Sequence, residues 1–364
     1  MGSRLYTETT MQTTMGEKAL TGAPMLADNP RLEAARSGDR EAFDRLTEPY
    51  RHELQVHCYR MLGSLLDAED VVQETMLKAW RKLDTYQARA SLRAWLYKIA
   101  TNTCLDSLSA SRRRGLPYGL YPEALPGAAA LPPVTDPIWI EPFPDACLAP
   151  SPHSPEARYE AREAITLAFV VALQSLPARQ RAVLILRDVL GWGAGEVGEL
   201  LDFSPSAVYS ALYRARRAME RAHHGADLAT LRSTPADPEL GDLLHRYVRA
   251  WEAADVDGLI RLLKEDATFG MPPLPSWHRG PAAIRDFVLR HVLEGEASGR
   301  WKLLQTRASG QPAFGWYRRD EGPGSLTAFA IQVVTIEAGL IADVTTFGFP
   351  SLFPFFGLPM MLRE

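Results

Sequence analysis

The sequence predicts a multidomain chain: two all-α domains, the second with a helix-turn-helix, followed by an α+β domain. Two blocks with a helical period of apolar residues lie on either side of a proline- and glycine-rich stretch, 115–155. Segments with strand composition, separated by Gly, Pro and Asp, occur only after about Pro238. A length of 364 residues suits two or three domains.

These composition changes predict the domain bounds. We expect a disordered leader at 1–27, a first helical domain at 28–114 and a linker at 115–155. A second helical domain then spans 156–225, and the α+β domain spans 236–364. The linker contains an apolar island, "PIWIEPFPD", whose Trp139 and Phe143 indicate that it docks on another part of the chain.

Bulk composition limits the kinds of site. The hydrophobic fraction is 46% and the net charge is −4, so any grip on nucleic acid must come from local basic patches. Cys58, Cys104 and Cys147 are widely spaced and fit neither a metal site nor a disulfide framework. We therefore expect no metal, no cofactor, no membrane contact and a cytoplasmic location.

In the first helical domain, "SGDREAFDRL" offers Ser37 or Asp39 as a helix N-cap. The stretch "DAEDVVQETMLKAW" has four acids and one lysine, with Asp67 as the expected N-cap. The next helix carries a continuous core-facing stripe of side chains, formed by Leu92, Trp95, Leu96, Ile99, Ala100 and Thr103.

The second helical domain contains the helix-turn-helix. A short helix should end near Leu201, Asp202 and Phe203 should form the turn, and Ser204 should cap a helix that begins at Pro205. That helix has an inward stripe of Val208, Leu212 and Ala215. Its other face is Ser206, Tyr209, Ser210, Tyr213, Arg214 and Arg217, which suits a recognition helix in a major groove. An ordinary helical hairpin with a solvated basic face is the alternative.

In the last domain, four segments have strand composition: "RWKLLQTRAS", "QPAFGWYRRD", "SLTAFAIQVVTIEAG" and "LIADVTTFGF". We expect helices packed on one face of an antiparallel sheet. A pocket inside this domain has as candidate lining residues Trp251, Asp266, Phe269, Trp277, His278 and Trp316. No acid–base pair at a catalytic spacing is evident, so we expect no catalytic residues and no enzyme activity.

The order of these segments resembles the extracytoplasmic-function group of bacterial sigma factors. "DAEDVVQETMLKAW" with "SLRAWLYKIATNTCLDSL" is similar to their second conserved region, and "LPARQRAVLILRDVLGWGAGEVGELLDFSPSAVYSALYRARRAM" to their fourth. The remainder resembles SnoaL-like cone domains, with the linker motif "WIEPFPD" and the tail "LFPFFGLP". The resemblance implies two partners, core RNA polymerase and promoter DNA.

The resemblance also implies roles for particular residues. Asp70, Gln73 and Glu74 would contact the polymerase clamp helices, while other parts of the chain meet the flap region. Tyr86 and Asn102 would form the pocket for an unpaired promoter base. The backbone contacts upstream of the start site would be Arg93, Lys98, Arg112, Arg113 and Arg114.

The C-terminal domain is expected to modulate the activity of the other two, by clasping them or by binding a small ligand in its cone. Two other functions stay open at this point. One is a helix-turn-helix regulator that never joins polymerase, and the other is a SnoaL-like enzyme with accessory helical domains.

Overall fold

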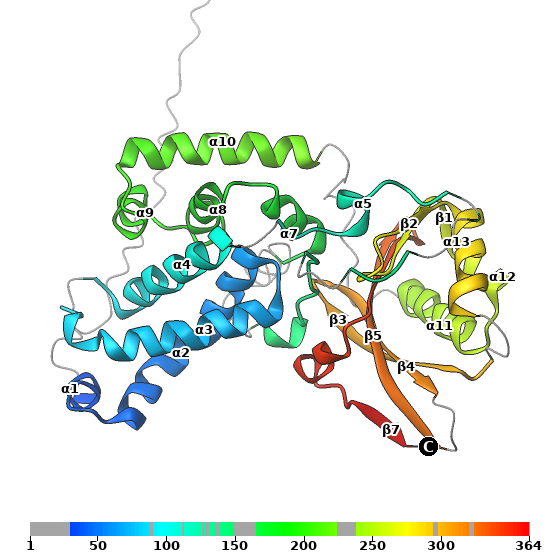
Figure 1. Cartoon of the computed structure of the whole chain (residues 1–364), viewed down its shortest axis with the longest axis horizontal. Coiled ribbons are helices and arrows are strands. Elements are labelled where there is room, and N and C mark those ends of the chain that lie inside the picture. The colour runs from blue at the N-terminus through cyan, green and yellow to red at the C-terminus, as the bar shows by residue number, and fades with distance from the viewer. Residues whose placement is uncertain are drawn as a thin grey trace, which may run out of the picture.

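The structure is a computed structural model that describes residues 30–87, 90–110, 113–125, 127, 131–134, 138–148, 165–223, 238–293, 298–319 and 324–363. The predicted leader, Arg112 and about a third of the linker lie outside these ranges. In Figure 1 the two helical domains occupy one half of the molecule and the sheet domain occupies the other.

The first helical domain consists of α1 (Pro30–Arg36), α2 (Arg40–Leu62), α3 (Leu65–Arg81), the short turn η2 (Leu83–Thr85) and α4 (Leu92–Ala110). Asp39 caps α2 as predicted, and its Oδ1 accepts a hydrogen bond from the Ala42 N–H at 3.0 Å. The predicted cap of α3 was wrong. Ser64, not Asp67, is the N-cap, because Gly63 ends α2 in the left-handed region (φ 73°) and lets α3 begin at once.

The second helical domain consists of α7 (Leu167–Gln174), α8 (Ala178–Leu184), a π-helical turn η4 (Ile185–Val189), α9 (Ala194–Leu201) and α10 (Pro205–His223). The helix-turn-helix is confirmed. Asp202 adopts the left-handed conformation (φ 57°) in the turn, and Ser204 Oγ accepts a hydrogen bond from the Ala207 N–H at 3.2 Å. A side chain at Gly198 would lie 2.7 Å from the Phe203 carbonyl oxygen, so this tight turn needs glycine there.

In its described residues the third domain has three helices: α11 (Pro238–Glu252), α12 (Val256–Ile260) and α13 (Pro281–Phe287), the last continuing into the π-helical turn η6 (Val288–Val292). Its described strands are β1 (Leu263–Gly270), β2 (Trp277–Arg279), β3 (Trp301–Ala308), β4 (Gln311–Arg319), β5 (Ser325–Glu337), β6 (Leu340–Phe347) and β7 (Met361–Arg363). All four segments predicted as strands are strands, β3 to β6.

The sheet order is β2-β1-β6-β5-β4-β3, with β7 paired to β5. The expectation of an antiparallel sheet was only partly right, because β1 runs parallel to β6, with Phe269 opposite Val344. The chain leaves β1, crosses by α13 and returns only after the β3–β5 meander, so the sheet is mixed.

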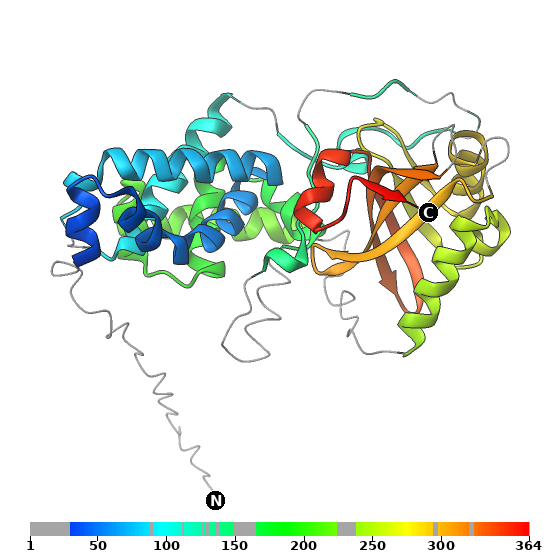
Figure 2. The ribbon, with the colours of Figure 1, turned by 90° about the horizontal axis from the view of Figure 1, so that it is seen from below.

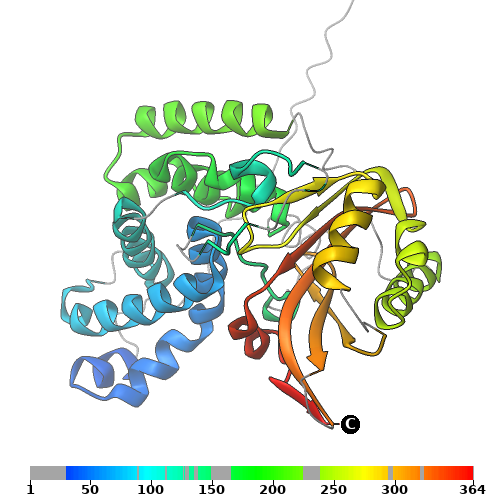
Figure 3. The ribbon, with the colours of Figure 1, turned by 45° about the vertical axis from the view of Figure 1, so that its right-hand side comes forward.

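The two faces of this sheet have different neighbours. The inner face, with Phe314 and Trp316, packs under α11 and α13. The outer face, with Ile331 and Phe347, joins one continuous core with the helical domains. In Figure 3, α13 covers one face, while the turn η7 (Pro350–Phe356) lies on the side toward the helical domains. Figure 2 shows η7 between the two halves of the molecule.

The linker joins all three domains, through short turns α5 (Pro117–Leu120) and η3 (Asp145–Cys147). Phe143 is fully buried, and its ring lies 4.8 Å from that of Tyr59 in α2. Its N–H donates to Ser309 Oγ at 3.0 Å, and the Ser309 N–H donates to the Phe143 carbonyl at 2.7 Å. The predicted docking of the apolar island is therefore confirmed, with α2 on one side and the β3–β4 turn on the other.

Candidate protein- and nucleic-acid-binding surfaces

A polar stripe runs along the exposed side of α3. Asp70, Gln73 and Glu74 are all exposed and fall on one helix face at spacings of three and four, and Leu77 continues the stripe with 50% exposure. Glu74 forms an ion pair with Lys78 at 2.9 Å, which leaves Asp70 as a carboxylate directed to solvent. The stripe is thus free to meet a protein partner.

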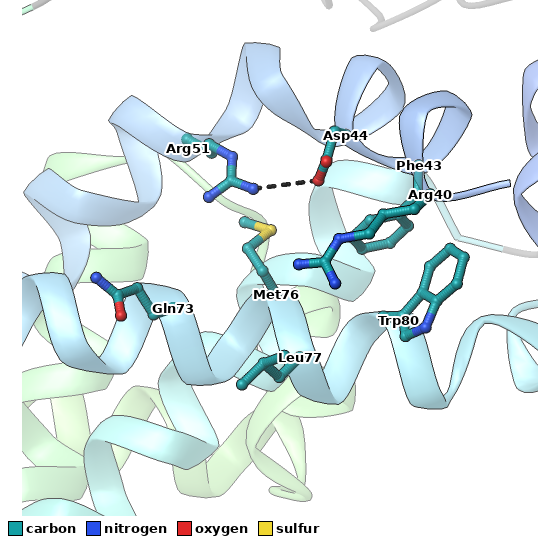
Figure 4. Close-up of a pocket in the computed structure, with 8 residues that line it drawn as sticks. All are labelled: Arg40, Phe43, Asp44, Arg51, Gln73, Met76, Leu77 and Trp80. Atoms are coloured by element: carbon teal, nitrogen blue, oxygen red, sulfur yellow. Dashed lines mark hydrogen bonds and ion pairs between the residues drawn. The ribbon is translucent and has the colours of Figure 1, made fainter.

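Beside this stripe lies a groove between α2 and α3, with a volume of about 240 Å³ (Figure 4). It is lined by Arg40, Phe43, Asp44, Arg51, Gln73, Met76, Leu77 and Trp80. Phe43 and Trp80 meet edge to face at 5.1 Å and form part of its apolar floor, and Arg51 lies 3.5 Å from Asp44 at the rim. Sequence reasoning did not find this groove, because its two walls lie about thirty residues apart along the chain.

The predicted base pocket around α4 is only partly open. The Tyr86 side chain is buried, with its ring 5.2 Å from that of Trp95 and its hydroxyl donating to the Ala90 carbonyl at 2.9 Å. Burial raises the pKa of this phenol. Asn102, by contrast, is exposed on the surface of α4.

Two cations of α4 are engaged in contacts with other parts of the chain. Arg93 pairs with Glu53 of α2 at 2.7 Å, and its guanidinium lies 5.7 Å from the ring of Trp192, which precedes α9. Lys98 donates to the Glu199 carbonyl at 2.8 Å and approaches Asp202 Oδ1 at 3.3 Å. The helix-turn-helix domain therefore covers part of the α4 surface, as the proximity of α9 to α4 in Figure 1 also shows.

The arginines after α4 occupy different environments. Arg114 is buried, pairs with Asp67 at 2.5 Å and donates to the Trp139 carbonyl at 2.9 Å. Arg113 is exposed. In this arrangement Arg114 is committed to the linker and to α3, so only Arg113 of the two faces solvent.

The outer face of α10 is open to solvent along its length. All six predicted contact residues are exposed, and the large side chains Tyr209 and Tyr213 are 58% and 62% exposed. The predicted inward stripe of Val208, Leu212 and Ala215 is buried. Exposed aromatic rings interleaved with arginines have no role in the core and suit a nucleic-acid surface.

A small cavity lies among the described residues of the third domain. It measures about 30 Å³, comparable to the volume of one water molecule, and is lined by Phe269, Met271, His291, Val292, Trp301, Trp316, Phe329 and Thr346. Two predicted residues, Phe269 and Trp316, line it, and the ring of Trp251 packs 4.6 Å behind that of Trp316.

The other predicted residues of this pocket lie outside the cavity. Asp266 is exposed and lies 3.5 Å from Lys264, because β1 begins at Leu263 and directs this side chain outward. Trp277 donates its indole N–H to the Tyr121 carbonyl of the linker at 3.0 Å. His278 stacks on Phe287 at 4.4 Å, and burial lowers its pKa to about 4, so the imidazole is neutral at pH 7.

Across the described ranges, no three His, Cys, Asp or Glu side chains gather as metal ligands would. The described helices also include none with the length and apolar content needed to span a bilayer.

Comparison with known proteins gives three family matches. Residues 46–114 match Sigma-70 region 2, residues 166–219 match Sigma-70 region 4, and residues 244–344 match a SnoaL-like domain. The ECF RNA polymerase sigma factor SigG of Mycobacterium tuberculosis is 42% identical over 344 residues, covering 94% of this chain and 90% of SigG. The chain belongs to the ECF RNA polymerase sigma factors.

Two further similarities agree with this membership. The ECF RNA polymerase sigma factor SigJ of Mycobacterium tuberculosis is 32% identical over 254 residues, covering 68% of this chain and 70% of SigJ. A crystal structure of the extracytoplasmic-function sigma factor SigJ superposes with a TM-score of 0.55 at 23% identity, covering 87% of this chain and 99% of that one. The sigma factor fold with a fused SnoaL-like domain is therefore shared, and the chain is a transcription initiation factor, not an enzyme.

Proposed function

We propose that this sigma factor binds core RNA polymerase through the α3 stripe and carries it to promoters that it reads with α4 and α10. The observation that supports this is the separation of charge. An exposed stripe containing Asp70 and Glu74 and an exposed arginine-bearing face on α10 lie on different domains. A carboxylate stripe repels phosphate, so it suits a basic protein partner and not DNA.

The polymerase contact is made by Asp70, Gln73 and Glu74 on the clamp helices. The groove beside them suits an apolar side chain of the same partner, since its floor is formed by Met76 and Trp80 while its rim is charged. The second helical domain meets the flap region. The assignment of this partner follows the family. The described surface supports it with exposed carboxylates and with a groove that can receive an apolar side chain.

Promoter reading is divided between the two helical domains. Duplex DNA meets α10, where Ser206 and Ser210 allow close approach and Arg214 and Arg217 neutralise phosphates. The unpaired base is captured near Tyr86 and Asn102. Because the Tyr86 ring is packed against Trp95, it must move before it can stack on a base.

The SnoaL-like domain modulates this activity by favouring a closed arrangement. Phe143 and Asp145 of the linker are fixed by hydrogen bonds to the β3–β4 turn, including Asp145 to the Gly310 N–H at 2.8 Å. The same arrangement holds α9 over Lys98. Promoter opening therefore requires the helical domains to separate, and a fused domain at high effective concentration opposes that separation.

The test is run-off transcription with purified core polymerase on a random promoter library. We expect the full chain to select a defined set of promoters, and a chain ending before Pro238 to change core affinity or open-complex formation. No selected promoter would contradict the proposed function. Identical behaviour of the two chains would contradict the role of the SnoaL-like domain alone.

A further inference from the structure

Another hollow lies where the two helical domains meet. Its volume is about 320 Å³, at the lower end of the range of small-molecule sites, roughly 300–1,000 Å³. One wall comes from the ends of α2 and α4 and the start of α3, and the other comes from the segment joining α7 to α8.

The hollow is rich in cations. Its lining includes Arg113, Arg114 and Arg181 but only one acid, Asp67. The Asp67 carboxylate is already paired with Arg114 at 2.5 Å. Among the residues that the structure describes, Arg113 and Arg181 therefore have no carboxylate partner, and the lining carries an excess of positive charge.

Arg181 is unusual because it is a buried cation with only neutral acceptors. Its side chain is 4% exposed, and it donates to the Met61 carbonyl, to Gln174 Oε1 at 2.5 Å and to the Leu176 carbonyl at 3.2 Å. Its Nε finds no acceptor in the described part of the chain. Burying a charge without a counter-ion is unfavourable, so an anion bound in this hollow would stabilise Arg181.

The charge persists at neutral pH. Burial, and to a lesser extent the neighbouring Arg113, lowers the pKa of Arg181 to about 10, so its guanidinium stays protonated at pH 7. The Arg113 guanidinium can offer a pair of N–H donors to the oxygens of a phosphate. Arg181 adds its Nε–H, because its terminal N–H groups already donate to protein acceptors. Leu108 and Leu176 add apolar wall beside these donors.

We propose that this hollow binds a small phosphorylated anion, with its phosphate between Arg113 and Arg181 and its organic part against Leu108 and Leu176. A backbone phosphate of duplex DNA is the other source of the same chemistry. The depth of Arg181 disfavours it, because a duplex cannot bring its backbone to a side chain that is 4% exposed.

The site also predicts regulation, and this part rests on the proposed function. Arg113 follows α4 of the first helical domain, whereas Arg181 belongs to α8 of the second. A ligand that needs both can bind only while the two domains are together. By linkage it favours the closed arrangement and weakens binding to core polymerase.

The binding test uses isothermal titration of the full chain with inorganic phosphate and inorganic pyrophosphate at constant ionic strength. Arg113→Ala removes an exposed side chain and should leave the fold intact, and Arg81→Ala is the matched control, because Arg81 is an exposed arginine on α3 outside the hollow. We expect saturable pyrophosphate binding by the parent and by Arg81→Ala, and about tenfold weaker binding by Arg113→Ala.

Two results would overturn the site: no saturable binding of either anion by the parent, or equal weakening by both substitutions. If a DNA oligonucleotide bound in a way that depends on Arg113, and pyrophosphate did not bind, the arginines would be assigned to promoter DNA instead. Saturating pyrophosphate should also weaken association of the parent with core polymerase but not that of Arg113→Ala. If pyrophosphate left the association of the parent with core polymerase unchanged, the regulatory role would be refuted but the binding site would stand. The titrations that test the site itself do not involve polymerase.

Discussion

Replacing Glu141 by alanine should loosen the junction between the linker and α3. One oxygen of this side chain, Oε2, accepts hydrogen bonds from Ser64 Oγ at 3.0 Å, the Leu65 N–H at 2.7 Å and the Leu66 N–H at 3.1 Å. A carboxylate from the linker thus satisfies the free donors at the start of α3, beside the positive end of the helix.

The magnitude follows from these three bonds. A hydrogen bond to a charged group is worth roughly 1.5–3 kcal/mol, and the half-buried position lets water replace part of the loss, so we expect a local cost of about 3 kcal/mol. Burial raises the pKa of Glu141 despite these bonds, because the cost of desolvating the carboxylate outweighs their stabilisation of its charged form. At 1.4 kcal/mol per tenfold change, the opening equilibrium shifts about 100-fold.

Hydrogen exchange measures this opening directly. The Leu65 and Leu66 amides should exchange roughly 100-fold faster in Glu141→Ala. The matched control is Glu123→Ala, which removes an exposed linker carboxylate that lies 3.9 Å from Arg279 and should change exchange little. Equal protection of these two amides in Glu141→Ala and in the parent would refute the reasoning.

Three other substitutions test separate parts of the account. Asn102→Ala should impair promoter melting, measured by permanganate reactivity, but leave duplex binding and core binding unchanged; equal melting would remove Asn102 from the pocket. Arg214→Ala should weaken duplex binding at all sequences and reduce the salt slope by about 1, as for a phosphate contact, and an unchanged slope would exclude that contact. Burial lowers the pKa of His57 to about 3, so the unfolded state binds its proton first as the pH falls below about 6.5. This residue should therefore lower the free energy of unfolding by about 2 kcal/mol between pH 7 and pH 5. As the pH is lowered from 7 to 5, the midpoint of unfolding should fall less in His57→Gln than in the parent. An identical pH dependence of the two proteins would refute this assignment.

The sequence predictions that were confirmed rest on local sequence patterns. The inward stripe of α10, the caps Asp39 and Ser204 and the strands β3 to β6 depend on neighbours within a few residues. Exposure of Asp70, Gln73 and Glu74 also follows from their positions on one helix face. Their roles in binding stay predictions.

Features that depend on tertiary contacts could not be predicted in this way. Nothing in the sequence near Glu141 indicates that its carboxylate accepts hydrogen bonds from the free N–H groups of a helix more than seventy residues earlier. The local sequence suggests that Arg114 is a surface cation. It is buried because it pairs with Asp67 and donates a hydrogen bond to the Trp139 carbonyl. The parallel pairing of β1 with β6 likewise depends on where the chain returns after the meander.

The central claim is that a negatively charged stripe on α3 binds core RNA polymerase. The most direct measurement is the dissociation constant of the full chain from purified core enzyme, by fluorescence anisotropy, for the parent, Asp70→Asn and the control Asp106→Asn, an exposed acid on α4. We predict a specific complex that Asp70→Asn weakens severalfold while Asp106→Asn does not. No association of the parent, or equal affinity of all three proteins, would contradict the account.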